Sequence, residues 1–335
     1  MHIRDFPKQK WHLAPTEFWL QLSEALTHYT PPPSTLTVKN PDRKWEITSA
    51  YQKMIRRGDW AVAQRLVSAM FCLPAELPYF WKRVPVVAAE DIGLANVELT
   101  QFVFACSAVY GPKSPDFYKV FCFLTHIMCD APARSRVTCS YSVIEGIMKL
   151  MHPNIHNGWT ESTKAAMAFI AKQKLTENTP YSQWLAKSEW RGEGMLQYLR
   201  MLDVPLTPRE EVPMPEVKLL FGLPNLCYDM HTRVGMRSLT RLTGVTALRE
   251  FYAANPYVKK DAKMLGWLLF FAEGGRLQGE LVNEGIAADE QYAVRKKFSL
   301  SPEQYLHLSA IVVEQVTTGK LDQIRLSCLN ETYPS

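Results

Sequence analysis

Apolar residues recur every three or four positions along most of the chain, which is the period of an amphipathic α-helix. Gly58 and Asp59 separate two such runs in residues 49–70, where a glycine is suited to end one helix and an acid to cap the next. The pattern predicts two helices joined by a tight turn, an αα-hairpin. Its apolar positions are Tyr51, Met54, Ile55, Trp60, Ala63, Leu66, Val67 and Met70.

The rest of the chain is also predicted to be helical. Alternation of apolar and polar residues, which is typical of strands, is nearly absent, so the pattern predicts an all-α, multi-helix bundle. Ser301-Pro302-Glu303 carries the residues expected where a helix starts. The other helices are expected at about 16–29, 96–110, 114–130, 135–152, 160–174, 181–188, 194–202, 231–243, 245–254, 259–273, 287–298 and 302–318.

Prolines set the expected division into regions. Pro180, Pro205, Pro208, Pro213, Pro215 and Pro224 interrupt the helical period, because proline lacks the N–H that a helix interior needs. We expect an N-terminal arm and connector over 1–45 and a helical domain over 46–175. A proline-rich connecting region over 176–224 then leads to a C-terminal helical domain over 225–335.

Composition narrows the class of protein. A chain of 335 residues with 47% hydrophobic residues can bury a sizeable core, and its net charge of +5 is mild, so an acidic partner would need local clusters of basic residues. Seven cysteines without a C-x-x-C pair indicate reduced thiols and a cytoplasmic location. We see no signal peptide and no run of about 18 apolar residues that would span a membrane.

Residues 49–96 resemble a known family. They contain Ser-Ala-x-x-Lys-x-x-Arg-x-x-Asp from Ser49 and Glu-Asp-Ile-Gly-Leu-Ala from Glu90, and this pair of motifs resembles the helical region that follows the ATPase module in the RarA (MgsA) family of clamp-loader-like AAA+ proteins. The resemblance implies a bacterial or phage protein with a collar-like fold, self-association and work at replication forks. It does not imply ATP hydrolysis, because no G-x-x-x-x-G-K-[ST] motif is present. Trp60 departs from the family, which has a small or polar residue there.

Two acids in this region lie where a negative charge is unfavourable, so we expect basic side chains to neutralise them. Glu90 and Asp91 lie at the end of a predicted helix closed by Gly93, where a carboxylate opposes the helix dipole at a cost of about 0.3–1 kcal/mol each. We expect a packing lock between helices rather than an acid–base pair, and a metal site would need further ligands that the sequence does not place nearby. The expected partners are Lys53, Arg56, Arg57 and Arg83.

A second informative stretch is the basic helix expected at 231–243. Arg233, Arg237 and Arg241 fall within about 80° of one another on a helix and rise about 6 Å apart, close to phosphate spacing. No acid lies between Thr232 and Arg249. We therefore expect this edge to bind nucleic-acid phosphates, with a plain solvated surface as the alternative. Further basic candidates are Lys259, Lys260, Arg295, Lys296 and Lys297.

The start of this helix leaves a catalytic alternative open. Asp229 and His231 could activate a neighbouring nucleophile such as Cys227, Tyr228 or Thr232, although we favour a capping role for these residues. No metal-binding motif occurs, because Pro153 breaks the helical geometry that His152 and His156 would need. We expect neither a metal nor another cofactor.

Three functions follow as hypotheses. The first is a non-enzymatic accessory protein of DNA replication, recombination or repair that binds DNA, single-stranded or forked, together with replication proteins. The second is a protein-interaction or oligomerisation adaptor without DNA binding, in which Trp60, Phe80 and Trp81 serve partners rather than the core. The third is a nucleic-acid-processing enzyme centred on Asp229, His231 and Arg233.

Overall fold

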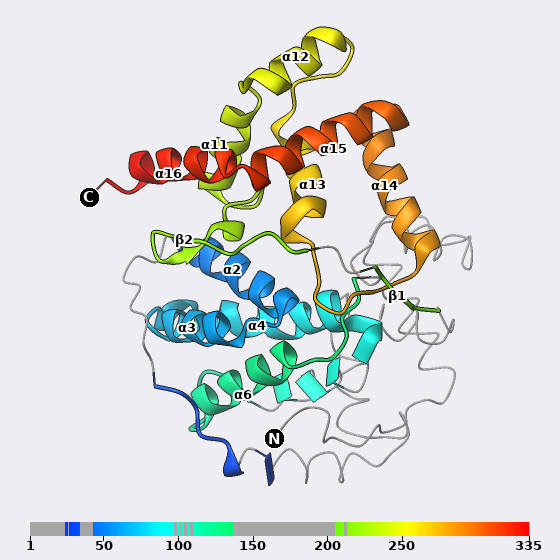
Figure 1. Ribbon diagram of the computed structural model, residues 1–335. Coiled ribbons are helices and arrows are strands. Elements are labelled where there is room, and N and C mark those ends of the chain that lie inside the picture. Colours follow the sequence, from blue (N-terminus) through cyan, green and yellow to red (C-terminus); the bar gives the residue numbers. More distant parts are fainter. Residues whose placement is uncertain are drawn as a thin grey trace, which may run out of the picture.

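The computed structural model describes residues 24–25, 27–33, 43–96, 99–100, 102–103, 106–107, 110–136, 205–210 and 213–334. These residues are mostly helical, so the predicted all-α class is confirmed (Figure 1). The expected helices at 160–174, 181–188 and 194–202, and most of those at 16–29 and 135–152, lie outside the described residues. No described helix is long and apolar enough to cross a membrane.

The first group of helices surrounds α2. It consists of α2 (Lys44–Arg57), α3 (Trp60–Phe71), α4 (Leu77–Val87) and α6 (Phe117–Cys129). A π-helical turn (Ala88–Ile92) follows α4, and two 3₁₀ turns cover Pro74–Glu76 and Gly93–Asn96. Asn96 Oδ1 accepts a hydrogen bond from the Leu99 N–H at 3.2 Å, as expected of a helix cap.

The α2–α3 turn forms as its sequence predicts. Gly58 has φ +66°, the left-handed conformation that glycine adopts most easily, and a Cβ there would lie 3.0 Å from the Cys129 carbonyl oxygen. Asp59 then caps α3, since its carboxylate accepts from the Val62 N–H at 3.0 Å. The two helices pack against each other as the predicted αα-hairpin.

The second group contains the C-terminal helices. These are α11 (Arg233–Leu242), α12 (Thr246–Ala254), α13 (Ala262–Leu269), α14 (Glu284–Phe298), α15 (Pro302–Thr317) and α16 (Lys320–Thr332). A π-helical turn (Phe270–Gly274) extends α13, and a 3₁₀ turn (Asn225–Cys227) precedes α11. Ser301 forms the predicted cap of α15, in a reciprocal capping box with Gln304. Helix α16 was not predicted.

The described residues also contain four two-residue strands, which pair into two small antiparallel sheets. β1 (Thr207–Pro208) pairs antiparallel with β4 (Leu281–Val282), and β2 (Leu219–Leu220) pairs with β3 (Leu223–Pro224). Phe221 (φ +51°) and Gly222 (φ +78°) make the tight turn of the β2–β3 hairpin. Such strands are too short for a period of two to show in the sequence.

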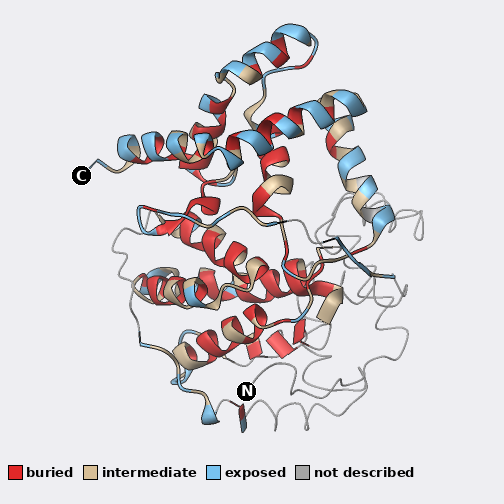
Figure 2. Ribbon diagram, in the orientation of Figure 1, coloured by how far each residue is buried: buried red, intermediate tan, exposed pale blue. Residues whose placement is uncertain are grey.

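The buried residues form two clusters, one in each group of helices (Figure 2). The first cluster also takes in Leu220, Leu226 and Tyr228, and it reaches Leu329 in α16. We expected a boundary at residue 224 between a connecting region and a C-terminal domain. The first core cluster continues across that position, so the core is not divided there. Residues 220–234 instead fasten the second group of helices to the first.

Candidate nucleic-acid interface

Helix α11 begins at a cap and buries one face. The Thr232 hydroxyl accepts from the Gly235 N–H at 3.2 Å, as its sequence predicts. Gly235 packs so closely that a Cβ would lie 1.8 Å from the Asp229 carbonyl oxygen. Because Val234 and Leu239 are also buried, Arg233, Arg237 and Arg241 remain along the edge of the helix that solvent can reach.

Two of these arginines converge on one acid. Arg237 Nη2 and Arg241 Nη2 each lie 2.6 Å from Glu331 Oε2. Their Nη1 atoms donate to the hydroxyls of Thr332 and Ser327, both at 3.0 Å. We call these five residues the α11–α16 clasp.

The clasp corrects one expectation from the sequence. The absence of an acid between Thr232 and Arg249 does not leave the arginines unpaired, because Glu331 approaches from α16, 90 residues beyond Arg241. All three charged side chains stay accessible, with 39% of each arginine side chain and 43% of the Glu331 side chain exposed. Hydrogen bonds from Arg241 and the charges of both arginines lower the pKa of Glu331.

Arg233 differs from its two neighbours. Its side chain is exposed, and within the described ranges it takes part in no hydrogen bond or ion pair. The edge of α11 therefore presents three guanidinium groups against a single carboxylate and keeps an excess of positive charge.

The other predicted basic residues lie elsewhere. Lys259 and Lys260 are exposed in the loop between α12 and α13, and Lys260 Nζ lies 5.8 Å from the centre of the Tyr252 ring. Lys297 Nζ lies 5.6 Å from the Trp267 ring, and Arg295 and Lys296 belong to the same end of α14. Figure 1 shows α14 and α16 on opposite sides of the C-terminal helices. The end of α14 is thus not brought together with the clasp.

The acids of residues 90–91 are compensated inside the fold. Arg56 Nε lies 2.6 Å from Asp91 Oδ1, and the Asp91 side chain is fully buried. Gln52, which the sequence did not single out, donates to both carboxylates at 2.9 and 2.8 Å. Arg83 approaches Glu90 at 3.8 Å. Side chains from α2, α4 and the first π-helical turn are thus fixed together.

Arg56 extends this network to the second group of helices. Its Nη1 donates to the Gly274 carbonyl at 2.6 Å, so one guanidinium joins both π-helical turns of the described chain. A π-helical turn accommodates one extra residue and so re-aims the groups on it. That geometry fits the placement of Asp91 and of the Gly274 carbonyl around Arg56.

Two of the expected partners of Glu90 and Asp91 bind elsewhere. Lys53 forms its salt bridge with Asp229 and donates to the Ser49 hydroxyl at 2.6 Å. Arg57 donates to the Pro215 carbonyl at 2.6 Å. The expectation for both is wrong, because the fold brings other acceptors, the Asp229 carboxylate and the Pro215 carbonyl, within reach of these two side chains. We call this set of buried and partly buried residues the α2 seam: Ser49, Gln52, Lys53, Arg56, Glu90, Asp91 and Asp229.

Asp229 holds the chain just before α11 and the Lys53 side chain of α2 through its two carboxylate oxygens. Asp229 Oδ1 accepts from the His231 backbone N–H at 2.8 Å, while its other oxygen faces Lys53. Burial alone would raise the pKa of Asp229, but Lys53 and His231 outweigh it and lower that pKa far below its usual value. The His231 ring is 68% exposed and 3.5 Å from the carboxylate. Asp229 is therefore a charged anchor for α2 at neutral pH.

The neighbouring nucleophiles are not activated. Burial raises the pKa of Cys227 and of Tyr228 well above their usual values. The Tyr228 hydroxyl donates to the Leu220 carbonyl at 2.8 Å, which holds it to the β2–β3 hairpin. These groups do not form the acid–base pair that the enzyme hypothesis requires around Asp229.

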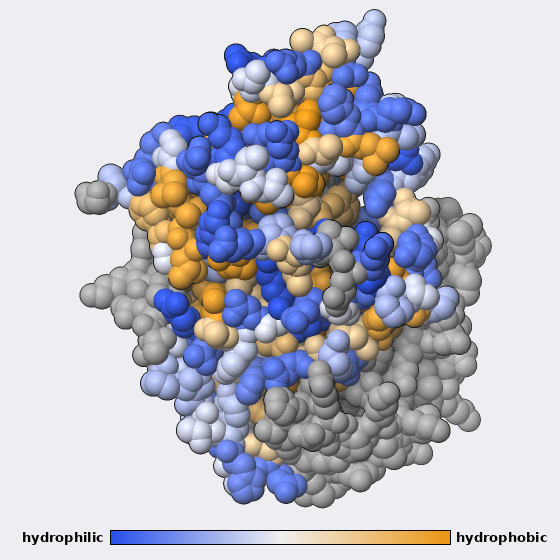
Figure 3. Space-filling model, viewed as in Figure 1, coloured by the Kyte–Doolittle hydropathy of each residue, from blue (hydrophilic) through white to orange (hydrophobic). Residues whose placement is uncertain are grey.

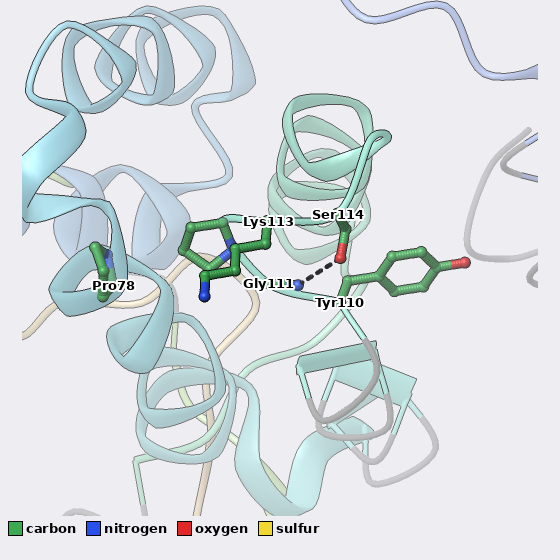
Figure 4. Close-up of a pocket in the computed structure, with 6 residues that line it drawn as sticks. Pro78, Tyr110, Gly111, Lys113 and Ser114 are labelled. Carbon is green, nitrogen blue, oxygen red and sulfur yellow. Dashed lines mark hydrogen bonds between the residues drawn. The ribbon is translucent and has the colours of Figure 1, made fainter.

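The described residues contain no group of three or more His, Cys, Asp or Glu side chains that could hold a metal ion. His152 and His156 lie outside these residues. A shallow depression of about 490 Å³ lies between the start of α4 and residues 110–114, which precede α6 (Figure 4). Its lining is largely apolar, with the Gly111 N–H donating to the Ser114 hydroxyl at 3.0 Å and Lys113 as its one charged residue.

The aromatic residues first considered for partners belong to the core. Phe80 and Trp81 are buried, and Trp60 stacks on His126 with 4.5 Å between ring centres. Other large side chains take the exposed positions, notably Trp45 (54% exposed) and Phe221 (40%). Figure 3 shows apolar surface gathered beside the β2–β3 hairpin.

Two buried arginines were missed by sequence reasoning. Arg134 donates to the carbonyls of Ile55 at 2.9 Å and Gln278 at 3.2 Å, and Arg325 pairs with Glu273 and with Asp322 at 3.1 Å. Both tie the first group of helices or residues 220–228 to the C-terminal helices. An arginine at an otherwise apolar helical position, as Arg325 is between Leu321 and Leu329, is the signal that could have found one of them.

We find no match to the chain among protein-family models, characterised proteins or solved structures. The resemblance of residues 49–96 to the RarA family therefore stays a prediction.

Proposed function

We propose that this protein is a non-enzymatic, nucleic-acid-binding accessory protein of DNA replication, recombination or repair. Its first group of helices would be the clamp-loader-collar-like core, and it would work in the cytoplasm of a bacterium or of a phage-infected cell. The edge of α11 would hold the phosphates. The enzyme hypothesis receives no support, since Asp229 is bound in the α2 seam and the described residues offer no metal site.

One observation carries the proposal. Arg237 and Arg241 are held side by side, with Nη2 atoms aimed at the same point in space, next to the exposed Arg233. Guanidinium groups suit phosphate oxygens because several N–H donors lie in one plane. Fixing them in advance reduces the conformational entropy that binding must take away. Contacts of this kind recognise the backbone of a strand rather than its sequence.

The test is binding of single-stranded, duplex and forked DNA at two salt concentrations, followed by fluorescence anisotropy. Arg233→Ala should weaken binding to all sequences alike and lower the salt dependence by about 0.7–0.9 ion, because one phosphate is no longer neutralised. Arg249→Ala is the matched control, since Arg249 is exposed on α12 and donates only to the Thr246 hydroxyl of its own helix, at 3.3 Å. An equal loss of affinity in both variants, or no binding by the wild type at about 50 mM salt, would reject the proposal.

The adaptor hypothesis is the second candidate, and it rests on exposed apolar side chains. Trp45 is exposed on α2, and Leu219 and Phe221 are exposed in the β2–β3 hairpin, where Arg43 donates to the Phe221 carbonyl at 3.0 Å. Leu306 and Val313 are exposed on the outer face of α15. Light scattering separates the candidates, because an adaptor that uses these residues to self-associate would be an assembly without DNA, and a monomer that binds DNA would not fit it.

A further inference from the structure

The Glu331 carboxylate occupies a site built for an oxyanion. It receives Nη2 of Arg237 at 2.6 Å and Nη2 of Arg241 at 2.7 and 2.6 Å. The same arginines also donate to two hydroxyls of α16, Arg237 to Thr332 and Arg241 to Ser327, and the Thr332 hydroxyl in turn donates to the Cys328 carbonyl. Two guanidinium groups, oriented by these hydroxyls, thus hold one negatively charged group at the surface.

The arginines on this edge of α11 carry more positive charge than Glu331 neutralises. Glu331 brings one negative charge to two arginines, and the exposed Arg233 adds a third positive charge on the same helix edge. A phosphate group offers more acceptor oxygens than a carboxylate, and a phosphomonoester carries about −1.5 to −2 at neutral pH. A phosphodiester in the middle of a strand carries only one negative charge. Two guanidinium groups therefore match a terminal phosphate better than either a carboxylate or an internal phosphate.

We infer that the α11–α16 clasp is a binding site for a single phosphate group, best matched by the terminal phosphate of a nucleic-acid strand, and that Glu331 occupies it in the free protein as an internal competitor. The inference rests on the proposed function for its ligand, since it takes the phosphate to belong to a nucleic acid. It assigns Arg237 and Arg241 of α11 to the site as the phosphate-binding residues, and Ser327 and Thr332 of α16 as the residues that orient them.

Glu331 can leave without unfolding the helix that carries it. The side chain is 43% exposed and lies in the last turn of α16. Leu321, Cys328 and Leu329 of α16 are buried, so the helix stays anchored when the carboxylate turns toward solvent. Exposed ion pairs are weak and are screened by salt, which makes exchange for a stronger anion feasible.

The experiment compares wild type with Glu331→Gln, which keeps the side chain's size and loses its charge. The probes are two oligothymidylates of about 20 nucleotides, longer than a typical single-strand site, one with a 5′-phosphate and one with a 5′-hydroxyl. Glu331→Gln should bind the phosphorylated strand about three- to fivefold more tightly than wild type, the factor that an exposed ion pair can contribute. Glu314→Gln on the exposed side of α15 changes the net charge equally and should leave both affinities unchanged.

Each outcome of this comparison either supports or overturns the inferred phosphate site. A gain confined to the 5′-phosphorylated strand supports a terminal phosphate, and an equal gain for both strands supports the site with internal phosphates as its ligand. If wild type binds DNA and Glu331→Gln behaves like Glu314→Gln, the inference is wrong while the proposed function stands.

A measurement without DNA distinguishes failure of this inference from failure of the proposed function. If neither protein binds an oligonucleotide, the proposed function is wrong, and thermal unfolding in inorganic phosphate then decides about the site. Phosphate should stabilise Glu331→Gln more than wild type, and should lose this effect when Arg237 and Arg241 are also changed to Ala. Equal stabilisation of Glu331→Gln and wild type would overturn the site itself.

Discussion

The α2 seam and the α11–α16 clasp use the same chemistry in opposite surroundings. Both pair arginine with a carboxylate at 2.6 Å, yet Asp91 is fully buried and Glu331 is 43% exposed. A buried ion pair cannot be broken without leaving a charge in an apolar interior, whereas an exposed pair exchanges its partner for water at little cost. The seam therefore holds the fold together, and only the clasp is free to change its ligand.

The largest expected effect follows from removing Arg56. Arg56→Ala should lower the free energy of unfolding by about 3–5 kcal/mol, because the buried Asp91 carboxylate would lose the positive charge that neutralises it. Chemical denaturation measures the change. Arg83→Ala is the control within the same region, since Arg83 is partly exposed and 3.8 Å from Glu90, and should cost about 0–1 kcal/mol. Equal costs for both variants would mean that burial does not distinguish the pairs.

The second prediction concerns Lys53 and pH. The folded-state pKa of Asp229 is depressed, so the stability that this carboxylate contributes is present above its unfolded pKa of about 4 and is lost as pH falls below it. Lys53→Met removes the larger of the influences that depress this pKa and leaves burial, which raises it, opposed by His231 alone. The variant should be less stable than wild type at pH 7, and the difference should shrink as pH falls below about 4.

Urea unfolding of both proteins between about pH 3 and pH 7 measures this prediction, within the range where Asp229 changes its charge in the variant. A difference that stays constant over this range would show that Lys53 stabilises the fold by packing rather than through Asp229.

The third prediction moves to the clasp, where binding should respond and folding should not. Arg237→Ala should leave the midpoint of thermal unfolding close to that of wild type, since its partner Glu331 is exposed. It should weaken DNA binding across all sequences, and Arg237→Lys should weaken it less, because lysine keeps the charge and loses the planar fork. Calorimetry and fluorescence anisotropy supply the two readouts. A fall in stability with intact DNA affinity would make the clasp a structural tie like the seam.

The helices were predictable where packing follows a simple period. Residues 44–71 and 233–317 show apolar positions at helical spacing with clear caps, and helices occur there. Helix α16 escaped prediction because its buried face contains Arg325, which interrupts the apolar pattern with a fully buried charge. The strands escaped it because two residues cannot show an alternation.

The sequence allowed ion-pair partners to be predicted only between helices that lie close together in the chain. Arg56 and Arg83 were expected as partners of Glu90 and Asp91, and they lie there. Lys53 pairs with Asp229 across 176 positions and Arg241 with Glu331 across 90. Spacing within one helix carries no information about which distant helix packs against it, so the sequence could mark the arginines but not their acids.

The salt dependence of DNA binding is the sharpest test of a phosphate site on α11. The logarithm of the association constant is measured against the logarithm of salt concentration for wild type and for the variant with Arg233, Arg237 and Arg241 all changed to Ala. If the edge of α11 binds phosphates, the slope should fall by about two to three ions, at roughly 0.7–0.9 for each arginine removed. An unchanged slope in a variant that still folds and still binds DNA would contradict a phosphate site on this helix.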